Sequence, residues 1–409
     1  MLCVQKYGGS SVANAKRIHN VAQRIAETYR KGNQVVAVLS AQGDTTDELI
    51  QKAYEITPNP SKRELDMLLT TGEQQSVALM AMALHKLGLS AVSLTGYQMG
   101  LITSSAHGSA RIRRIDAERI YSELDRNNIV IAAGFQGVNR YGDITTLGRG
   151  ASDTTAVALA AVLKADLCEI YTDVDGIYTA DPRIVKNARK IKEIIYDEML
   201  ELAAQGAKVL ATRSVELAKK YQVAIVVRSS MSDEPGTVVK EEAKMESTYI
   251  SGLAVDKDVA SISVIGIKNK PGMAYKIFSL LAKDNIVVDI ILQSIGRDET
   301  KDIAFTVSKG DLRRAVDILL KNKAALGFED IAYDDKIVKV SVVGAGMASR
   351  PGVASMLFEA LYAAGINIMM ISTSEIKISV LIDEREADAA ANVVHDRFFT
   401  GRAAIEAAQ

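Results

Sequence analysis

The stretch TTLGRGASDTT, Thr145–Thr155, leads from an expected strand end into an expected helix through a glycine-rich turn. Two other strand ends run into similar turns, KYGGSS at Lys6–Ser11 and SAQGDTTD at Ser40–Asp47. In such turns free backbone N–H groups and the helix dipole attract anions, and glycine lets a phosphate approach the backbone. Lys6 and Arg149 add full positive charges. Ordinary turns and helix caps explain any one loop equally well. Three loops, two of them with a cation, favour phosphate chemistry.

The residues around these loops, from 1 to about 230, alternate short β-branched runs with stretches of helical periodicity. The expected strands are Leu2–Gln5, Gln34–Ser40, Ala91–Thr95, Ile129–Ala133, Leu167–Tyr171 and Val223–Val227. Alternating strands and helices predict a mostly parallel α/β sheet with helices on both faces. Such sheets bind ligands in the crevice beyond the carboxyl ends of their strands, where the three loops begin.

Composition narrows the class of protein. A chain of 409 residues predicts two or three domains, and 48% hydrophobic with 24% charged residues excludes a disordered or fibrous protein. A net charge of −1 gives no indication of nucleic acid or membrane partners. Two cysteines cannot form a disulfide framework, which favours a reducing compartment. With no signal peptide visible and no apolar run long enough to span a bilayer, we expect a cytoplasmic protein.

The second half contains a linker and an internal repeat. Ser232–Ser247 is charged, contains Pro235-Gly236 and lacks an apolar face, so the linker is expected there. Ile262–Gly266, followed by Pro271-Gly272, recurs as Val340–Gly344, followed by Pro351-Gly352. From the Pro-Gly onward, the two copies are separated by a constant 80 residues. Repeats of this length predict two copies of a small βαββαβ domain.

The sequence has no Walker A pattern, GxGxxG fingerprint or protein-kinase catalytic loop, and no nucleophile–base constellation among its four histidines. Phosphorylating a carboxylate would need no general base, because the nucleophile is already ionised at neutral pH. Glu73, beside Gly72 in an apolar stretch, fits either a substrate amine or a solvated position. Tyr171–Arg183 (YTDVDGIYTADPR) follows a buried-type strand; a nucleotide loop fits it better than a metal loop, since the spacing is not an EF-hand.

Six motifs in this order resemble the aspartate kinase family over essentially the whole chain. They are KYGGSSV at Lys6–Val12, SAQGDTTDEL at Ser40–Leu49, LLTTGE at Leu68–Glu73, GFQG at Gly134–Gly137, TLGRGASDTT at Thr146–Thr155 and YTDVDGIYTADPR at Tyr171–Arg183. The resemblance implies an α/β amino-acid-kinase fold followed by two ferredoxin-like βαββαβ ACT domains. The implied boundaries are 1–231 for the kinase domain, 232–250 for the linker, and 251–332 and 333–409 for the ACT domains.

The resemblance also implies transfer of the ATP γ-phosphoryl group to the side-chain carboxylate of L-aspartate, as the first step of lysine, methionine and threonine synthesis. The implied catalytic residues are Lys6, which would stabilise the transferring group, and Asp153, which would organise Lys6. The implied aspartate-binding residues are Thr46, Glu73, Phe135, Arg149 and Ser152. The implied ATP-binding residues are Lys6, Tyr7, Gly8, Gly9, Ser10, Ser40, Thr172, Asp173, Tyr178, Asp181, Arg183, Lys208 and Val209. Mg²⁺ would arrive on the nucleotide phosphates, with no protein ligand assigned.

Two positions depart from the family pattern. Ala151 replaces the usual second glycine of Gly-Arg-Gly-Gly, which is tolerable if its φ is negative. Leu210-Ala211-Thr212 stands where many relatives have Leu-His-Pro, and it leaves the charged Lys208 in place.

In this family, paired ACT domains bind amino acids and inhibit the kinase. The matching positions are Asn269, Met273, Ala274, Asp289 and Gln293 in the first copy, and Val353, Ala354, Asn367, Ile368, Ser374 and Glu375 in the second. Asp289 and Gln293 suit threonine, whereas Asn269 stands where lysine-sensitive relatives often carry aspartate. The effector, threonine or lysine or both, stays open, and a pure dimerisation module is the alternative.

Relatives pair through their ACT domains, so a homodimer or higher oligomer is expected. Some relatives also make a separate regulatory subunit from an internal start, for which Met245 is the candidate here. Two other functions compete: an amino-acid kinase acting on glutamate or acetylglutamate, which leaves the tandem repeat unexplained, and a catalytically dead amino-acid sensor. The sensor requires loss of a charged site residue, but Lys6, Glu73, Arg149 and Asp153 are all present.

Overall fold

The computed structural model describes residues 1–148, 150–207, 209–242, 249–294, 300–347 and 350–400. The predicted internal start, Met245, lies outside these residues. The chain divides into two compact units: 1–178, 190–203 and 208–247 form the first, and 179–189, 204–207 and 248–409 form the second. No helix among the described residues is long and apolar enough to cross a membrane.

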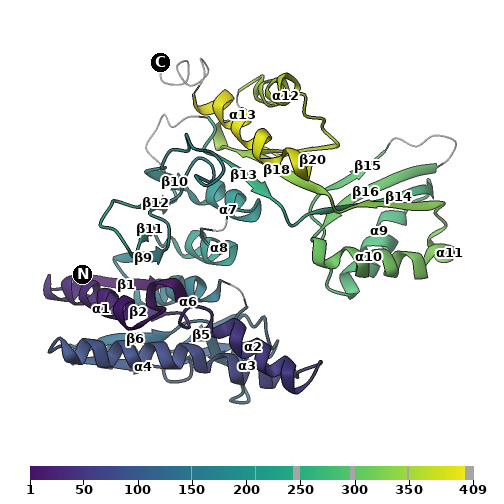
Figure 1. The fold of residues 1–409 in the computed structure, drawn as a ribbon. Helices are drawn as coiled ribbons and strands as arrows, with labels where there is room; N and C mark the ends of the chain where they lie inside the picture. The colour runs from purple at the N-terminus through teal and green to yellow at the C-terminus, as the bar shows by residue number, and fades with distance from the viewer. Residues whose placement is uncertain (149, 208, 243–248, 295–299, 348–349, 401–409) are drawn as a thin grey trace. The chain divides into compact units, whose positions relative to one another are not determined.

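The first unit is built on an eight-stranded sheet, shown with its helices in Figure 1. Its strands, in spatial order, are β10 (Glu193–Ile195), β12 (Thr237–Lys240), β11 (Ile225–Ser229), β9 (Leu167–Thr172), β1 (Leu2–Tyr7), β2 (Gln34–Leu39), β6 (Ile129–Ala133) and β3 (Ala91–Leu94). All neighbouring pairs are parallel except β11 with β12. The six expected strands and the mostly parallel sheet are therefore confirmed; β11 starts two residues later than expected.

Helices cover both faces of this sheet. Side chains alternate along a strand, so Tyr7, Val35 and Ile131 share one face, where they pack with α1 (Ala15–Arg30) and α4 (Thr71–Lys86). α6 (Ala151–Leu163) packs on the other face of β1 and against α8 (Thr212–Tyr221). The remaining helices of the unit are η1 (Gly9–Val12), α2 (Thr45–Ile56), α3 (Lys62–Leu69), α5 (Glu118–Asp125) and α7 (Tyr196–Ala204). Loops at the carboxyl ends of β1 and β2 lead directly into helices.

A second, smaller sheet lies in the same unit and was not predicted. Its strands, in order, are β5 (Ile112–Ile115), β4 (Leu101–Thr103), β7 (Gln136–Val138) and β8 (Ile144–Thr146). Strands of three or four residues are too short to show a period of two, which explains why the sequence did not reveal them. β8 ends at Thr146, within the glycine-rich stretch Thr145–Thr155.

The expected linker is partly a strand. Thr237–Lys240, within Ser232–Ser247, forms β12, which pairs with β11 and β10. The Pro-Gly turn and the surrounding charges hid a short β-branched segment, so part of the expected linker is a strand of the main sheet.

The second unit contains the two copies of the repeat, each with a four-stranded antiparallel sheet. The first sheet orders β15 (Ile291–Gln293), β16 (Thr300–Val307), β14 (Ala260–Lys268) and β17 (Asp330–Asp334), and it packs with α9 (Met273–Lys283) and α10 (Lys309–Lys321). The second orders β13 (Gly252–Asp256), β18 (Ile337–Val343), β20 (Lys377–Asp383) and β19 (Met370–Thr373), and it packs with α12 (Val353–Ala363) and α13 (Ala387–Phe399). Shorter helices are α11 (Lys323–Leu326), η2 (Ala345–Met347) and η3 (Glu384–Glu386).

Two segments join the second copy from elsewhere in the sequence. β13, which precedes the first copy, pairs with β18 instead of with the strands that follow it. The segment 179–189 contributes Ala180 and Val185 to the apolar core of the second copy. There Thr179 Oγ1 contacts Nε2 of the buried His395 at 2.9 Å. The boundaries of the two ACT domains stay a prediction. The second copy of the repeat also includes residues that lie outside its predicted boundaries, in β13 and in 179–189.

Candidate functional site

Lys6 and Asp153 form an ion pair at the carboxyl end of β1. The distance between Lys6 Nζ and Asp153 Oδ1 is 2.7 Å, and the two side chains are 12% and 9% exposed. Alternation along β1 turns Tyr7 toward α1 and Lys6 toward α6, whose first turn carries Asp153. The loop after β1 lies beside the ammonium, since a Cβ built on Gly8 would be 3.4 Å from Lys6 Nζ. The two predicted catalytic residues are thus in direct contact.

The three glycine-rich loops meet around this pair. Gly9 accepts a hydrogen bond from Gly43 N at 3.1 Å, and a Cβ on Gly9 would lie 2.6 Å from Ala41 O, so only glycine allows this approach. Ser40 Oγ donates to Ser152 Oγ at 2.9 Å, which joins the second loop to the start of α6. Loops that are far apart in sequence therefore bring their backbone N–H groups close to Lys6.

Glu73 lies in the first turn of α4 and is only 3% exposed, so the alternative of a solvated position is wrong. Its Oε1 accepts a hydrogen bond from Ala41 N at 3.1 Å. Among the described residues Oε2 has no hydrogen-bond partner, although it is buried. Burial raises the pKa of Glu73 to about 7, against the opposing effect of the backbone N–H groups of Ala41 and of Glu73 itself. A buried oxygen without a donor suits an incoming ammonium group.

The other predicted aspartate-binding residues are spread over neighbouring loops. Phe135 adopts φ +68°, which is unfavourable for an aromatic residue, and its carbonyl accepts from Leu147 N at 2.9 Å. Ser152 lies against Gly134, where an added Cβ would be 2.6 Å from its Oγ. Thr46 is half-buried in the first turn of α2. Arg149 lies outside the described residues.

The family departure at Ala151 is compatible with the fold. Ala151 is the first residue of α6 and is buried, so its backbone is helical with negative φ, as the prediction required. Thr212, in the second departure, begins α8, and Ala211 has the extended N-cap conformation. Neither substitution disturbs the contacts of Lys6 and Asp153.

The predicted nucleotide-binding residues follow β9. Thr172 Oγ1 accepts from Val174 N, and Asp173 is exposed at the strand end. Tyr178 donates its hydroxyl to Asp175 Oδ1 at 2.8 Å. Asp181 and Arg183 belong to the second unit, where they form an ion pair at 2.7 Å. Val209 is half-buried, and Lys208 lies outside the described residues.

The predicted effector positions occupy corresponding places in the two copies. Met273 with Ala274 begins α9, and Val353 with Ala354 begins α12; each pair follows a glycine in the left-handed conformation. Asn269 and Gln293 are exposed, and Asn367, Ile368, Ser374 and Glu375 flank β19.

Asp289 already has a partner within the chain. It forms an ion pair with Lys339, a 3% exposed lysine of β18 that also lies 3.6 Å from Asp256. The carboxylate that was expected to grip an effector is therefore held by a buried ammonium from the second copy.

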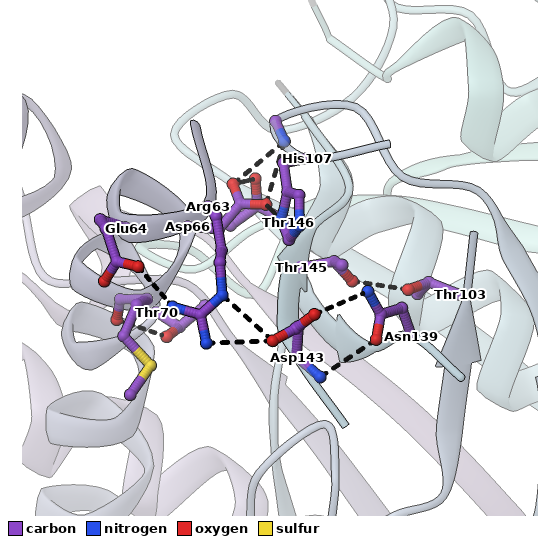
Figure 2. A network of polar contacts seen from close by, with 12 residues as sticks. Arg63, Glu64, Asp66, Thr70, Thr103, His107, Asn139, Asp143, Thr145 and Thr146 are labelled. Carbon is purple, nitrogen blue, oxygen red and sulfur yellow. Dashed lines mark hydrogen bonds and ion pairs between the residues drawn. The ribbon is translucent and has the colours of Figure 1, made fainter. Parts of the chain in front are cut away.

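Sequence reasoning missed two charged residues that organise the site, Asp66 on α3 and Arg213 on α8. Asp66 is 1% exposed and accepts hydrogen bonds from Gly108 N and Thr146 Oγ1 (Figure 2). Arg213 Nη1 donates to the carbonyls of Ala110 and Leu147, both at 3.0 Å. One signal was present: Asp66 interrupts the apolar run of α3 on the same helix face as Leu69, where a polar residue must have buried partners.

Comparison with known proteins defines the class. The amino acid kinase family model matches residues 1–229, and the ACT domain model matches residues 262–322 and 340–398. The chain therefore belongs to the amino acid kinase family and carries two ACT domains.

Similar proteins narrow this further. The chain is 53% identical to the aspartokinase of Mycolicibacterium smegmatis over 406 residues, covering 98% of this chain and 96% of that protein. It is also 53% identical to the aspartokinase of Geobacillus stearothermophilus, covering 97% of each. The structure of E. coli aspartokinase III in complex with aspartate and ADP matches with a TM-score of 0.83 at 25% identity, covering 98% of this chain and all of the other. Within its family, this chain is one of the aspartokinases.

Proposed function

We propose that the chain transfers the γ-phosphoryl group of ATP to the side-chain carboxylate of L-aspartate, giving 4-phospho-L-aspartate. This is the first step of lysine, methionine and threonine synthesis. The observation that carries the proposal is the Lys6–Asp153 pair, at 2.7 Å, among three loops rich in backbone N–H donors. The neighbouring Glu73 has a buried oxygen without a partner among the described residues. A substrate with both a carboxylate nucleophile and an ammonium group matches this arrangement.

In this mechanism the protein supplies position and charge. The attacking carboxylate of aspartate is ionised at neutral pH, so no general base is required. Lys6 stabilises the negative charge on the phosphoryl oxygens, while Asp153 holds the ammonium of Lys6 in place. Backbone N–H groups of the loop Gly8–Ser10 bind the phosphates. Glu73 accepts hydrogen bonds from the substrate ammonium, and Arg149 binds a substrate carboxylate. Mg²⁺ would be carried on the nucleotide phosphates, with no protein ligand assigned, and would neutralise part of their charge.

We further propose that amino acids regulate this activity through the ACT domains. The structure of E. coli aspartokinase III in complex with lysine and aspartate, described as the T-state, matches with a TM-score of 0.75 at 26% identity. In this chain the corresponding effector is threonine, lysine or both.

We also propose that two copies of the chain pair through their repeats. β15 and β19 are edge strands at corresponding positions of the two sheets. They expose Ile291 and Ile371, which are 50% and 40% accessible. An exposed apolar edge is a site for strand addition by another chain. The separate regulatory subunit starting at Met245 and the cytoplasmic location stay predictions.

ADP release by the purified protein, with MgATP and L-aspartate, tests the function. L-glutamate serves as the control substrate, and lysine and threonine are added singly and together. Release that depends on aspartate and responds to an amino acid supports both parts of the proposal. Release with glutamate alone assigns the chain to another amino-acid kinase. If neither substrate supports release while amino acids still bind, the chain is a sensor.

A further inference from the structure

Ser230, directly after β11, lies at the edge of the main sheet where the phosphate loop, Gly8–Ser10, begins. β1, β9 and β11 are neighbouring parallel strands, and Ser229 at the end of β11 pairs with Thr172 at the end of β9. The carboxyl ends of parallel strands meet at the edge of the sheet where such folds bind ligands. Ser230 therefore lies beside the loops that follow β1 and β9, although it is 219 residues from Ser11.

The hydroxyl group of Ser230 is shared between these two loops. Ser11 Oγ donates to Ser230 Oγ at 2.8 Å, and Ser230 Oγ donates to Thr172 O at 3.4 Å. The backbone N–H of Ser230 donates to the same carbonyl at 3.0 Å. Because a serine hydroxyl can donate one hydrogen bond and accept another, these contacts have compatible polarity. Ser11 and Ser230 are both buried, so the hydrogen bond between them is shielded from water.

Each end of this connection leads to residues that are predicted to bind ATP. Ser11 N donates to Gly8 O at 2.9 Å, which closes the loop after β1. At the other end, Thr172 Oγ1 donates to Asp173 Oδ1 at 3.0 Å. Ser230 therefore joins the phosphate loop to the strand end that carries the predicted nucleotide-binding residues Thr172 and Asp173.

We propose that Ser230 is a positioning residue for ATP: its hydroxyl holds the phosphate loop at the end of β9, so that one nucleotide contacts both. This inference rests on the proposed function. In this role Ser230 acts through Ser11 and Thr172 and does not itself contact the nucleotide. A serine that only stabilised the sheet would affect folding and leave the Michaelis constants unchanged. A positioning residue raises the KM for ATP.

Ser230→Ala removes the shared hydroxyl and leaves the backbone hydrogen bond to Thr172 in place. The buried hydroxyl of Ser11 then loses its acceptor, so we expect the KM for ATP to rise roughly 10-fold. The KM for L-aspartate, measured at saturating MgATP, should change by less than about twofold, because the contact between Glu73 and the Ala41 loop does not involve this serine.

Ser11→Ala tests the same connection from its other end. It removes the donor and leaves Ser230 bound to Thr172, so the KM for ATP should rise by a smaller factor, roughly fivefold. The double variant should match Ser230→Ala within about twofold, because the two hydroxyls act through one hydrogen bond.

Ser379→Ala is the matched control. Ser379 forms another buried serine–serine pair, with Ser341 at 2.8 Å, but this pair joins β20 to β18 in the second copy of the repeat. Its substitution should lower the melting temperature and change neither KM by more than about twofold.

The outcomes separate this inference from the proposed function. A wild-type protein without aspartate-dependent ADP release would contradict the function itself. With an active wild type, the inference is wrong if Ser230→Ala lowers the melting temperature without changing the KM for ATP, or raises both KM values equally. It is also wrong if the effects of Ser230→Ala and Ser11→Ala multiply in the double variant. If Ser230→Ala does not fold, Ser11→Ala decides by the same comparison of the two KM values.

Discussion

Replacing Glu73 by glutamine removes the carboxylate that the fold holds buried beside the Ala41 loop. The rise of its pKa from 4.5 to about 7 corresponds to roughly 3 kcal/mol that disfavours the ionised form in the free protein. The substrate ammonium would offset this cost by pairing with Oε2. We therefore expect Glu73→Gln to raise the KM for L-aspartate by roughly 10- to 100-fold, the range for a charged hydrogen bond, with little change in kcat.

The KM for L-aspartate should also depend on pH, in a direction set by the pKa of Glu73. Glu73 must be ionised to bind an ammonium, so the KM of the wild type for L-aspartate should fall as pH rises through about 7. In Glu73→Gln the KM should be flat between pH 6 and about 8.5, because the titrating group is gone.

Ionisation of Glu73 favours substrate binding but lowers the stability of the free protein. The folded protein binds the Glu73 proton more tightly than the unfolded chain does, so this group's contribution is present below pH 4.5 and is lost as pH rises to about 7. As pH rises from 4.5 to about 7, the free energy of unfolding of the wild type should therefore fall relative to that of Glu73→Gln.

Steady-state kinetics from pH 6 to about 8.5, together with chemical denaturation without substrate, measure both effects. Glu123→Gln is the control: Glu123 is also 3% exposed, but it lies on α5 and pairs with Arg119. It should change stability without changing the KM for L-aspartate. An unchanged KM in Glu73→Gln, or the same pH profile in the variant and the wild type, would refute the reasoning.

Three further predictions test other contacts. Lys6→Met removes the cation at the phosphoryl group and should lower kcat by roughly 10²- to 10³-fold, and an activity within tenfold of wild type would contradict its role. Gly9→Ala places a methyl 2.6 Å from Ala41 O, so it should lower the melting temperature and the activity together; normal values of both would show that the loops can separate. Lys339→Met frees Asp289, so half-inhibition by threonine or lysine should occur at an effector concentration about fivefold lower, with basal activity unchanged. An unchanged inhibition curve would show that Asp289 does not bind the effector.

The sequence predicted the main sheet because its strands are β-branched runs separated by helices with clear periodicity. It did not predict β4, β5, β7, β8 and β10, since strands of three or four residues carry no readable pattern. β12 was mistaken for linker because a Pro-Gly turn and several charges surround it. The pairing of β13 with β18 could not be read from the repeat, because sequence order favours pairing within one copy.

The parts of the site that consist of residues close together in the sequence could be predicted. The glycine-rich loops and Lys6 were found because turns, cations and helix starts occur together in the sequence. The burial of Glu73 was not, since it depends on the Ala41 loop, 32 residues away. Asp66 was missed for the same reason: its donor Thr146 is 80 residues distant, and only the fold brings them together. The Lys339–Asp289 pair likewise joins two copies of a repeat.

Trapping the reaction product tests the central claim most directly. Purified protein is incubated with MgATP, L-aspartate and hydroxylamine, which converts an acyl phosphate to a stable hydroxamate, and the hydroxamate is compared with the ADP formed. We predict about one molecule of aspartyl hydroxamate for each ADP with L-aspartate, and none with L-glutamate. The Lys6→Met variant, which lacks the cation that stabilises the transferring group, should form the hydroxamate roughly 10²- to 10³-fold more slowly. ADP formed without hydroxamate, or hydroxamate formed from L-glutamate instead, would contradict the account.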